Sequence, residues 1–160
     1  MNTRIAFAAI VAVSAAFAGE ASAQTQTVSF AVAPVNEMSV SGNPAALEIT
    51  TATAGSSLTS VSDASTTFAI TTNQTGTKIT ASLDEAMPAG VTLAVTLGAP
   101  TSALSIADVV LGTTDADLVT GITQLNESGK TITYTLSATA AAGVVASADR
   151  IVTYTVIAGS

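Results

Sequence analysis

Apolar residues alternate with threonine, serine or alanine in short segments along almost the whole chain. In VTLAVTL (91–97), for example, every second residue is Val or Leu, and the residues between them are Thr or Ala. Successive side chains of a β-strand point to opposite faces, so a period of two is typical of a strand with one buried face. Beyond residue 23, no segment repeats its apolar residues at the helical period of about 3.6. The sequence therefore predicts an all-β domain.

The alternation is clear in seven segments and weaker in three others. The clear segments are TVSFAV (27–32), ALEIT (46–50), TTFAITT (66–72), TKITASL (77–83), VTLAVTL (91–97), TITYTLS (131–137) and RIVTYTVIA (150–158). The weaker segments are EMSVS (37–41), ADVVL (107–111) and DLVTGITQL (117–125). We therefore expect about 7–10 short strands.

Turn signals separate these segments. NQTG (73–76) and NESG (126–129) are typical of hairpin loops. The small-residue stretch ATAAAGVVASAD (138–149) predicts either a short helical turn or a crossover between strands of different sheets. Many short strands without intervening helices predict a single Greek-key β-sandwich of the immunoglobulin-like or pilin-like kind. A closed barrel is the less favoured alternative.

The start of the chain differs in composition from the rest. MNTR carries one positive charge, the uncharged apolar run Ile5–Ala18 follows, and the small residues Ala-Ser-Ala precede Gln24. This order is typical of a signal peptide, and the run of 14 residues is shorter than the ~20 that span a bilayer. We expect a helical signal peptide over residues 1–23, which is cleaved, and one β-sandwich domain over residues 24–160. The mature protein is then secreted, in the periplasm or at the cell surface, without membrane insertion.

The composition argues against several classes of function. The chain has a net charge of −7, and removal of residues 1–23 leaves only Lys78, Lys130 and Arg150 as cations. Nucleic-acid binding is driven by clustered Lys and Arg, so we expect no nucleic-acid partner. Histidine and cysteine are both absent, which removes the commonest general base, the usual nucleophile–base pairs and the usual zinc ligands. We therefore expect no enzymatic activity, no catalytic residue and no cofactor.

Carboxylates are the remaining candidates for chemistry. Asp84 with Glu85, or Asp115 with Asp117, would be the acid–base pair of a glycoside hydrolase, which is the least favoured alternative. Asp115 and Asp117 also supply two oxygen ligands from one turn, and Asp108 joins them if the fold brings it close. Calcium is therefore the metal for which the sequence offers a candidate site.

Two of the strands share the motif TYT, centred on Tyr134 and Tyr154. We expect both tyrosines to face the core, which leaves few aromatic platforms for a carbohydrate-binding module. If the two strands were neighbours, their threonines would form a small hydroxyl array of the kind that binds ice. The array would consist of Thr133, Thr135, Thr153 and Thr155.

Several features together resemble a known group of proteins. They are the alanine-rich signal peptide, the early strand TQTVSFAV, the Thr-rich alternating strands and the late strand IVTYTVIAG. In these respects the chain is similar to small secreted bacterial fimbrial or coat-type β-sandwich subunits. The resemblance implies a structural or adhesive role outside the cytoplasm.

Both ends of the mature chain are expected to be apolar, alternating strands. A sheet edge exposes unpaired N–H and C=O groups that another strand can satisfy. Either both strands complete the same sandwich, or one of them is donated to another copy. The candidate strand-exchange residues are Val28, Phe30, Val32, Val152, Tyr154 and Val156.

The sequence thus favours a secreted, non-enzymatic protein with a structural or surface-interaction role, whose partners are itself or other surface proteins. Self-association as a fimbrial or coat-like subunit is one form of this role. The alternative is a carbohydrate- or calcium-dependent extracellular binding module. The ice-binding array is a further alternative.

Overall fold

The computed structural model describes residues 22–158, so the predicted signal peptide lies almost wholly outside the described residues. The chain divides into two compact units, Met1–Val32 and Ala33–Ser160, and all nine strands of the described part belong to the second. The strands are β1 (Asn36–Val40), β2 (Val61–Thr72), β3 (Thr77–Leu83), β4 (Val91–Leu97), β5 (Leu104–Ser105), β6 (Val109–Val110), β7 (Ala116–Ile122), β8 (Leu125–Ala138) and β9 (Val152–Ile157). Within residues 22–158 no helix is long and apolar enough to span a membrane.

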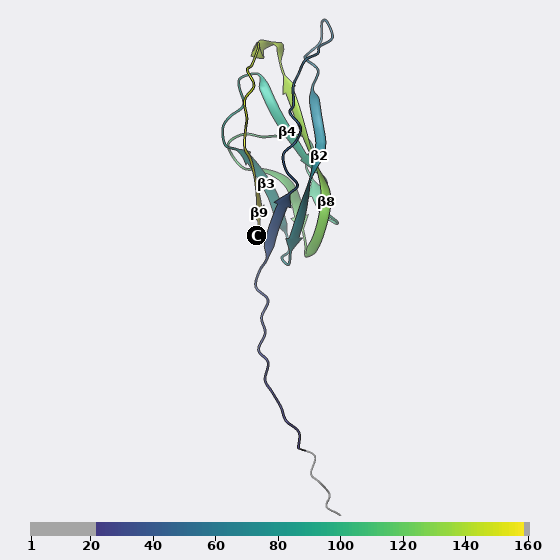
Figure 1. The fold of residues 1–160 in the computed structure, drawn as a ribbon, viewed down its shortest axis with the longest axis vertical. Coiled ribbons are helices and arrows are strands. Elements are labelled where there is room, and N and C mark those ends of the chain that lie inside the picture. Colours follow the sequence, from purple (N-terminus) through teal and green to yellow (C-terminus); the bar gives the residue numbers. More distant parts are fainter. Residues whose placement is uncertain (1–21, 159–160) are drawn as a thin grey trace, which may run out of the picture. The chain divides into compact units, whose positions relative to one another are not determined.

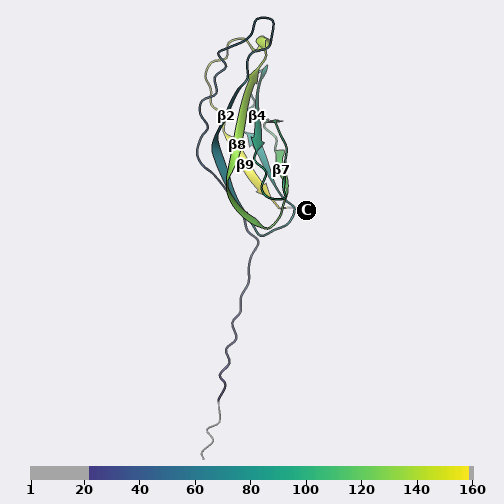
Figure 2. The same ribbon diagram turned by 90° about the vertical axis from the view of Figure 1, so that its right-hand side faces the viewer.

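The strands form two antiparallel sheets (Figures 1 and 2). The larger sheet has the order β1-β2-β8-β4-β6, and the smaller has the order β5-β7-β3-β9. Strands β2 to β9 alternate between the two sheets, so each strand from β3 onward lies in the sheet opposite to that of the preceding strand. Every connection after β2 therefore crosses between the sheets, and the all-β prediction is confirmed.

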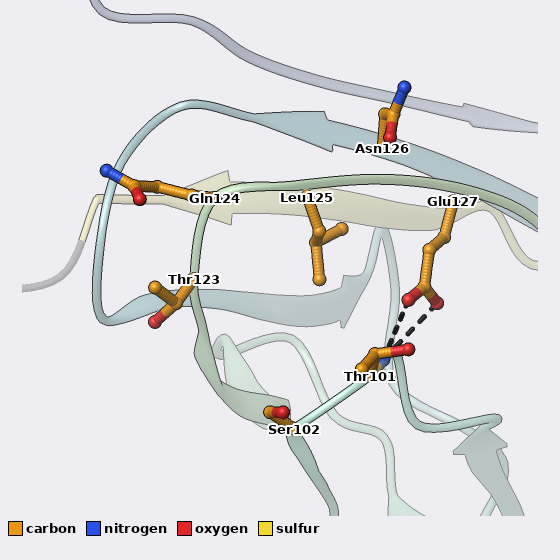
Figure 3. A pocket seen from close by; sticks show the side chains of 7 residues that line it. All are labelled: Thr101, Ser102, Thr123, Gln124, Leu125, Asn126 and Glu127. Carbon is orange, nitrogen blue, oxygen red and sulfur yellow. Dashed lines mark hydrogen bonds between the residues drawn. The ribbon is translucent and has the colours of Figure 1, made fainter.

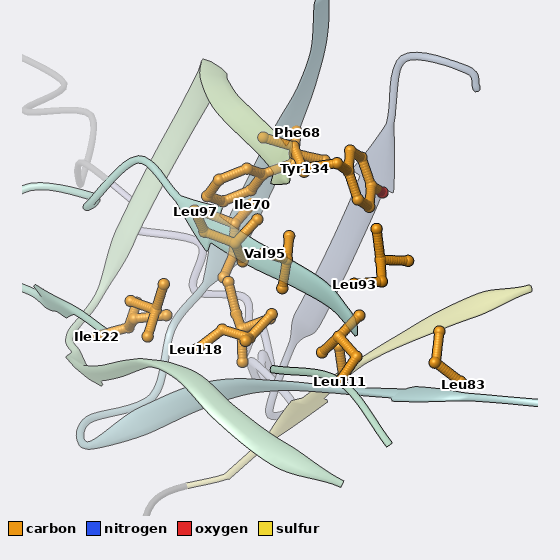
Figure 4. Close-up of a cluster of buried hydrophobic side chains, with 14 residues drawn as sticks. Phe68, Ile70, Leu83, Leu93, Val95, Leu97, Leu111, Leu118, Ile122 and Tyr134 are labelled. Carbon is orange, nitrogen blue, oxygen red and sulfur yellow. The ribbon is translucent and has the colours of Figure 1, made fainter. Parts of the chain in front are cut away.

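One apolar core lies between the two sheets (Figure 4). Phe68 and Ile70 of β2, together with alternate residues of β4 and β8, face the core from the larger sheet. Ile79 of β3 and Leu118 of β7 face it from the smaller sheet, and both are fully buried. Burial of each large aliphatic or aromatic side chain contributes roughly 1.5–3 kcal/mol, so this shared core holds the sheets together.

The alternation of apolar and small or hydroxyl-bearing residues in the sequence correctly predicted the positions of most strands. The bounds of β3 and β4 are those of the predicted segments 77–83 and 91–97. The weaker segments around Met38, Val109 and Leu118 are also strands, although β6 has only two residues. The stretch 138–149 contains the short 3₁₀ helix Ala140–Ala142 and connects β8 to β9 of the other sheet, so both of its predicted features are present.

Two predicted strands and two predicted hairpins are wrong. Residues 27–32 and 46–50 belong to no strand. NQTG (73–76) connects β2 to β3 in the other sheet, so it is an arch between layers. NESG (126–129) lies within β8, where the pairing with β2 shifts and Gly129 has a φ of 68°. This conformation suits glycine, and the turn-forming residues here make a bulge in a continuous strand.

Two tyrosine hydroxyls join the sheets through the core. Tyr134 of β8 and Tyr154 of β9 are hydrogen-bonded at 2.7 Å, and the two strands belong to different sheets. Burial raises the pKa of both hydroxyls, so both stay protonated and one donates to the other. The expectation that both tyrosines face the core is confirmed for Tyr134, which is 6% exposed, and Tyr154 packs against the core from its edge.

The four threonines predicted to form one array do not lie on one surface. Because Tyr134 and Tyr154 point inward from opposite sheets, their neighbours along each strand point to opposite outer surfaces. Thr133 and Thr135 therefore lie on one surface of the sandwich, and Thr153 and Thr155 lie on the other. The similar motifs reflect two strands that line one core, not two neighbours in one sheet.

The tyrosine pair generates a stability prediction. Tyr154→Phe leaves the Tyr134 hydroxyl without its partner in a largely buried position, and we expect a loss of about 1 kcal/mol in the free energy of unfolding. Replacing both tyrosines by Phe removes the orphaned group as well, so the double variant should lose clearly less than the sum of the two single variants. Urea unfolding of the four proteins measures this. Strictly additive losses would show that the hydroxyls do not act as a pair.

Candidate functional site

The carboxylates proposed as calcium ligands do not form one cluster in the described part of the chain. Asp117 forms an ion pair with Lys78 on the neighbouring strand, at 2.9 Å. Asp108 lies in the β5–β6 turn, where its N–H donates to the Thr96 hydroxyl at 2.8 Å. Among residues 22–158 no three acidic side chains lie close enough together to hold a metal ion. The arrangement does not gather Asp108, Asp115 and Asp117 into one cluster.

The other carboxylate pair supports the end of a strand. Asp84 accepts a hydrogen bond from the Ile151 N–H at 2.9 Å, and the Asp84 N–H donates to the Ile151 carbonyl at 3.1 Å. Glu85 faces Arg150 at 3.6 Å. These contacts continue the β3–β9 pairing beyond its last ladder residues. The two acids thus contact residues of the chain itself, whereas the acid pair of a hydrolase contacts the substrate.

A shallow depression lies between the β4–β5 and β7–β8 connections (Figure 3). It encloses about 390 Å³ and is lined by Thr101, Ser102, Thr123, Gln124, Leu125, Asn126 and Glu127. Glu127 is the charged residue of this lining, and it is already bound to Lys130 at 2.6 Å and to the Thr101 N–H at 3.0 Å. The Lys130 ammonium, with the Thr101 N–H, lowers the pKa of Glu127 to about 2. The carboxylate therefore joins β8 to the β4–β5 connection and offers little free charge to a ligand.

The side chain of Asn73 binds the chain just before β1. Its Oδ1 accepts from the Val35 N–H at 2.8 Å, and its Nδ2 donates to the Ala33 carbonyl at 2.8 Å. The Asn73 N–H also donates to the Val35 carbonyl, at 3.2 Å. The side-chain amide of Asn73 thus forms the hydrogen bonds that a neighbouring strand would otherwise form with these two backbone groups, and it fixes the position of residues 33–35. Sequence reasoning assigned Asn73 only to a hairpin loop, because a long-range side-chain contact leaves no mark in local sequence.

The six predicted strand-exchange residues have two different environments. Val28, Phe30 and Val32 belong to no strand, and their exposed fractions are 78%, 92% and 84%. Val152, Tyr154 and Val156 lie in β9 and pack against the core. The C-terminal half of the prediction is therefore an ordinary strand of the sandwich. The N-terminal half has the alternating pattern of a strand but belongs to neither sheet.

Strand β9 lies at one edge of the smaller sheet. It pairs with β3 on one side, and no strand of the described chain is hydrogen-bonded to its other side, although β1 of the larger sheet lies close to β9. Asp84 and Ile151 are a hydrogen-bonded pair, and the register from Leu83↔Val152 to Lys78↔Ile157 is unbroken. Hydrogen-bonded and non-hydrogen-bonded pairs alternate in an antiparallel ladder, so every second residue of β9 turns its N–H and C=O away from β3. The residues with these outward groups are Val152, Tyr154 and Val156.

Comparison with known proteins assigns no family to the chain: no family model matches it, and no curated protein is significantly similar to it in sequence. The site must therefore be argued from its geometry. Two separate features have unmet bonding capacity: the exposed apolar segment 27–32 and the edge of β9 that pairs with no strand.

The Glu127 contacts predict a pH dependence. A carboxylate whose folded-state pKa lies near 2, below its usual 4.5, stabilises the fold fully above about pH 4.5, and this contribution is lost as pH falls toward 2. Lys130→Met should raise the pKa of Glu127 toward 4.5, as followed by NMR titration of its side-chain carboxyl carbon. Lys78→Met, which breaks the separate pair with Asp117, is the matched control and should leave Glu127 unchanged. An unchanged Glu127 titration in Lys130→Met would contradict this account.

The calcium hypothesis has a direct test. Because Asp117 is paired with Lys78 and Asp108 is held at a turn, we expect millimolar calcium to leave the melting temperature unchanged. Thermal unfolding followed by circular dichroism, with and without calcium, measures this. A rise in melting temperature that Asp117→Asn abolishes would instead establish a calcium site.

Proposed function

We propose that the protein is a secreted, non-enzymatic structural subunit that associates with further copies of itself at the cell surface or in the periplasm. Its scaffold, in this proposal, is a Greek-key sandwich of the pilin-like or immunoglobulin-like kind, as in the fimbrial and coat-type subunits that its sequence resembles. The signal-peptide pattern of residues 1–23 supports export.

The observation that carries the proposal is the exposed, alternating segment 27–32. Three large apolar side chains at every second position are typical of a strand with one buried face, yet here they face solvent. Burying one such side chain stabilises a protein by roughly 1.5–3 kcal/mol, so the segment gains substantially from joining a sheet. Exposed apolar groups of this kind mark interaction sites. A second copy of the chain provides a sheet edge of the right chemistry.

The electrostatics agree with association through this segment. The whole chain has a net charge of −7, so copies repel one another on average. Residues 21–36 contain no charged side chain. An uncharged segment can approach another copy with less repulsion than the acidic parts of the surface.

The alternative functions have weaker support. A carbohydrate-binding module usually presents aromatic rings, whereas the two tyrosine hydroxyls bind each other between the sheets. A calcium-dependent module needs clustered carboxylates, and Asp117 is paired with Lys78. An ice-binding surface needs neighbouring threonines, and the four predicted ones are divided between two surfaces.

Removal of the apolar segment tests the proposal. The protein that begins at Gln24 should form multimers at high concentration, and the variant Val28→Ser/Phe30→Ser/Val32→Ser should be a folded monomer by sedimentation velocity. The changed side chains are exposed, so the melting temperature of the monomer should be unaffected. A matched control is Thr25→Ser/Thr27→Ser/Ser29→Thr, which should still assemble.

Two results would contradict the proposal. One is a wild-type protein that stays monomeric at every concentration. The other is a triple-serine variant that assembles as well as the wild type.

A further inference from the structure

The two sheets have four edge strands, and they differ as templates for pairing. Strands β5 and β6 have two residues each, which is a common way to blunt an edge. Strand β1 has five residues and carries Glu37 at its second position. Strand β9 has six residues, VTYTVI, with no charge, proline, glycine or bulge. Of these four edges, β9 is the longest, and its sequence has none of these protective features, although β1 of the larger sheet lies close to it.

From this comparison we propose that β9 of one copy is the acceptor for residues 27–32 of a second copy, which pair with it antiparallel and extend the smaller sheet to five strands. This inference rests on the proposed function and adds to it the acceptor strand, the register and the polarity of the assembly.

The side-chain patterns of the two segments match. The outward-facing backbone groups of β9 belong to Val152, Tyr154 and Val156, whose side chains face the core. The incoming segment presents Val28, Phe30 and Val32 at the same spacing of two. Antiparallel pairing places Phe30 opposite Tyr154, with a valine pair on each side. Such aromatic and β-branched cross-strand pairs stabilise sheets, and the apolar face of the smaller sheet would continue across the new strand.

The polarity follows from where the chain enters the sandwich. Asn73 anchors residues 33–35 at the β2–β3 arch, and β9 ends at the same arch because Ile157 pairs with Lys78. To reach its own β9, segment 27–32 would have to reverse at residues 33–35 and run parallel to that strand. In a second copy of the same orientation, an extended segment meets β9 antiparallel without any reversal.

The resulting contact is head-to-tail. The donated segment and the acceptor edge are different surfaces of the same chain, so one contact leaves a free segment and a free edge for the next. Heterologous contacts of this kind continue into a filament unless the rotation between copies closes a ring. The structure thus suggests linear multimers and not symmetric dimers.

Proline substitutions in the two longer edge strands, β9 and β1, test which of them accepts the added strand. Proline is tolerated at an edge strand where its missing N–H would face solvent, but there it blocks the addition of another strand. Val156→Pro removes an outward N–H of β9. Val40→Pro is the matched control, because Ser41 and Thr67 are a bonded pair and the N–H of Val40 therefore faces the open edge of β1. We expect Val156→Pro to weaken multimer formation at least about tenfold, with Val40→Pro near wild type.

Two checks keep this experiment decisive. Val156→Ala separates loss of the side chain from loss of the edge, and it should still assemble. Each variant is compared with the wild type by thermal unfolding, and if Val156→Pro unfolds, cross-linking decides. The expected register brings Ser29 of one copy opposite Thr155 of the next in a non-hydrogen-bonded pair, where the Cα separation suits a disulfide.

The chain has no cysteine, so Ser29→Cys/Thr155→Cys introduces the only thiols. On oxidation this variant should give a ladder of covalent multimers on a non-reducing gel. The control Ser29→Cys/Ser39→Cys places the second thiol on β1 and should give far less. A disulfide within single copies, or a stronger ladder from the β1 control, would overturn the assignment to β9.

The outcomes also separate this inference from the proposed function. If the triple-serine variant is monomeric while Val156→Pro assembles fully, self-association stands and β9 is not the acceptor. If the wild type never assembles, both proposals fail. If the triple-serine variant and Val156→Pro both stay monomeric and Val40→Pro assembles, both are supported.

Discussion

The single core between the two sheets is the constraint on which the rest of the structure depends. From β2 to β9 the chain crosses from one sheet to the other at every connection, so consecutive strands lie in opposite sheets on the two sides of the core. Pairing within each sheet is consequently long-range, as in the contact of β2 with β8 and of β3 with β9. Without a disulfide, the burial of residues such as Phe68, Leu118 and Ile122 must hold these distant segments in register.

The proposed function depends on the edges of the two sheets. A sandwich leaves unpaired backbone groups along four strands, and most proteins blunt such strands with short length, charge or proline. The chain does so at β5 and β6, which have two residues each, but not at β9. The same chain contains segment 27–32, which has the composition of a strand and no strand partner in the described structure. In our proposal, the edge of β9 in one copy and segment 27–32 of another copy are the two halves of one interface.

Charged side chains in this protein mostly serve the scaffold. Asp84 extends the β3–β9 pairing, Glu127 joins β8 to the β4–β5 connection, and Asp117 is paired with Lys78 across neighbouring strands. From sequence alone Asp84 and Asp117 were candidates for acid–base chemistry, and Asp117 also for calcium, because their spacing was known and their partners were not. Apart from Lys130 beside Glu127, the partners of these three carboxylates are distant in the sequence: Ile151 for Asp84, Thr101 for Glu127 and Lys78 for Asp117. Local sequence therefore identified the acids but not their contacts.

The sequence by itself determined that the domain is all-β, where most of its strands lie, and which of their faces is buried. It could do so because the period of two is a local property, as the bounds of β3 and β4 show. Only the tertiary structure decided which strands are neighbours. It placed Tyr134 and Tyr154 in opposite sheets, turned NQTG into an arch, made NESG a bulge and left segment 27–32 unpaired. The physical reason is that a strand's pattern records that one face must be buried, whereas its partner is chosen by contacts between residues far apart in the chain.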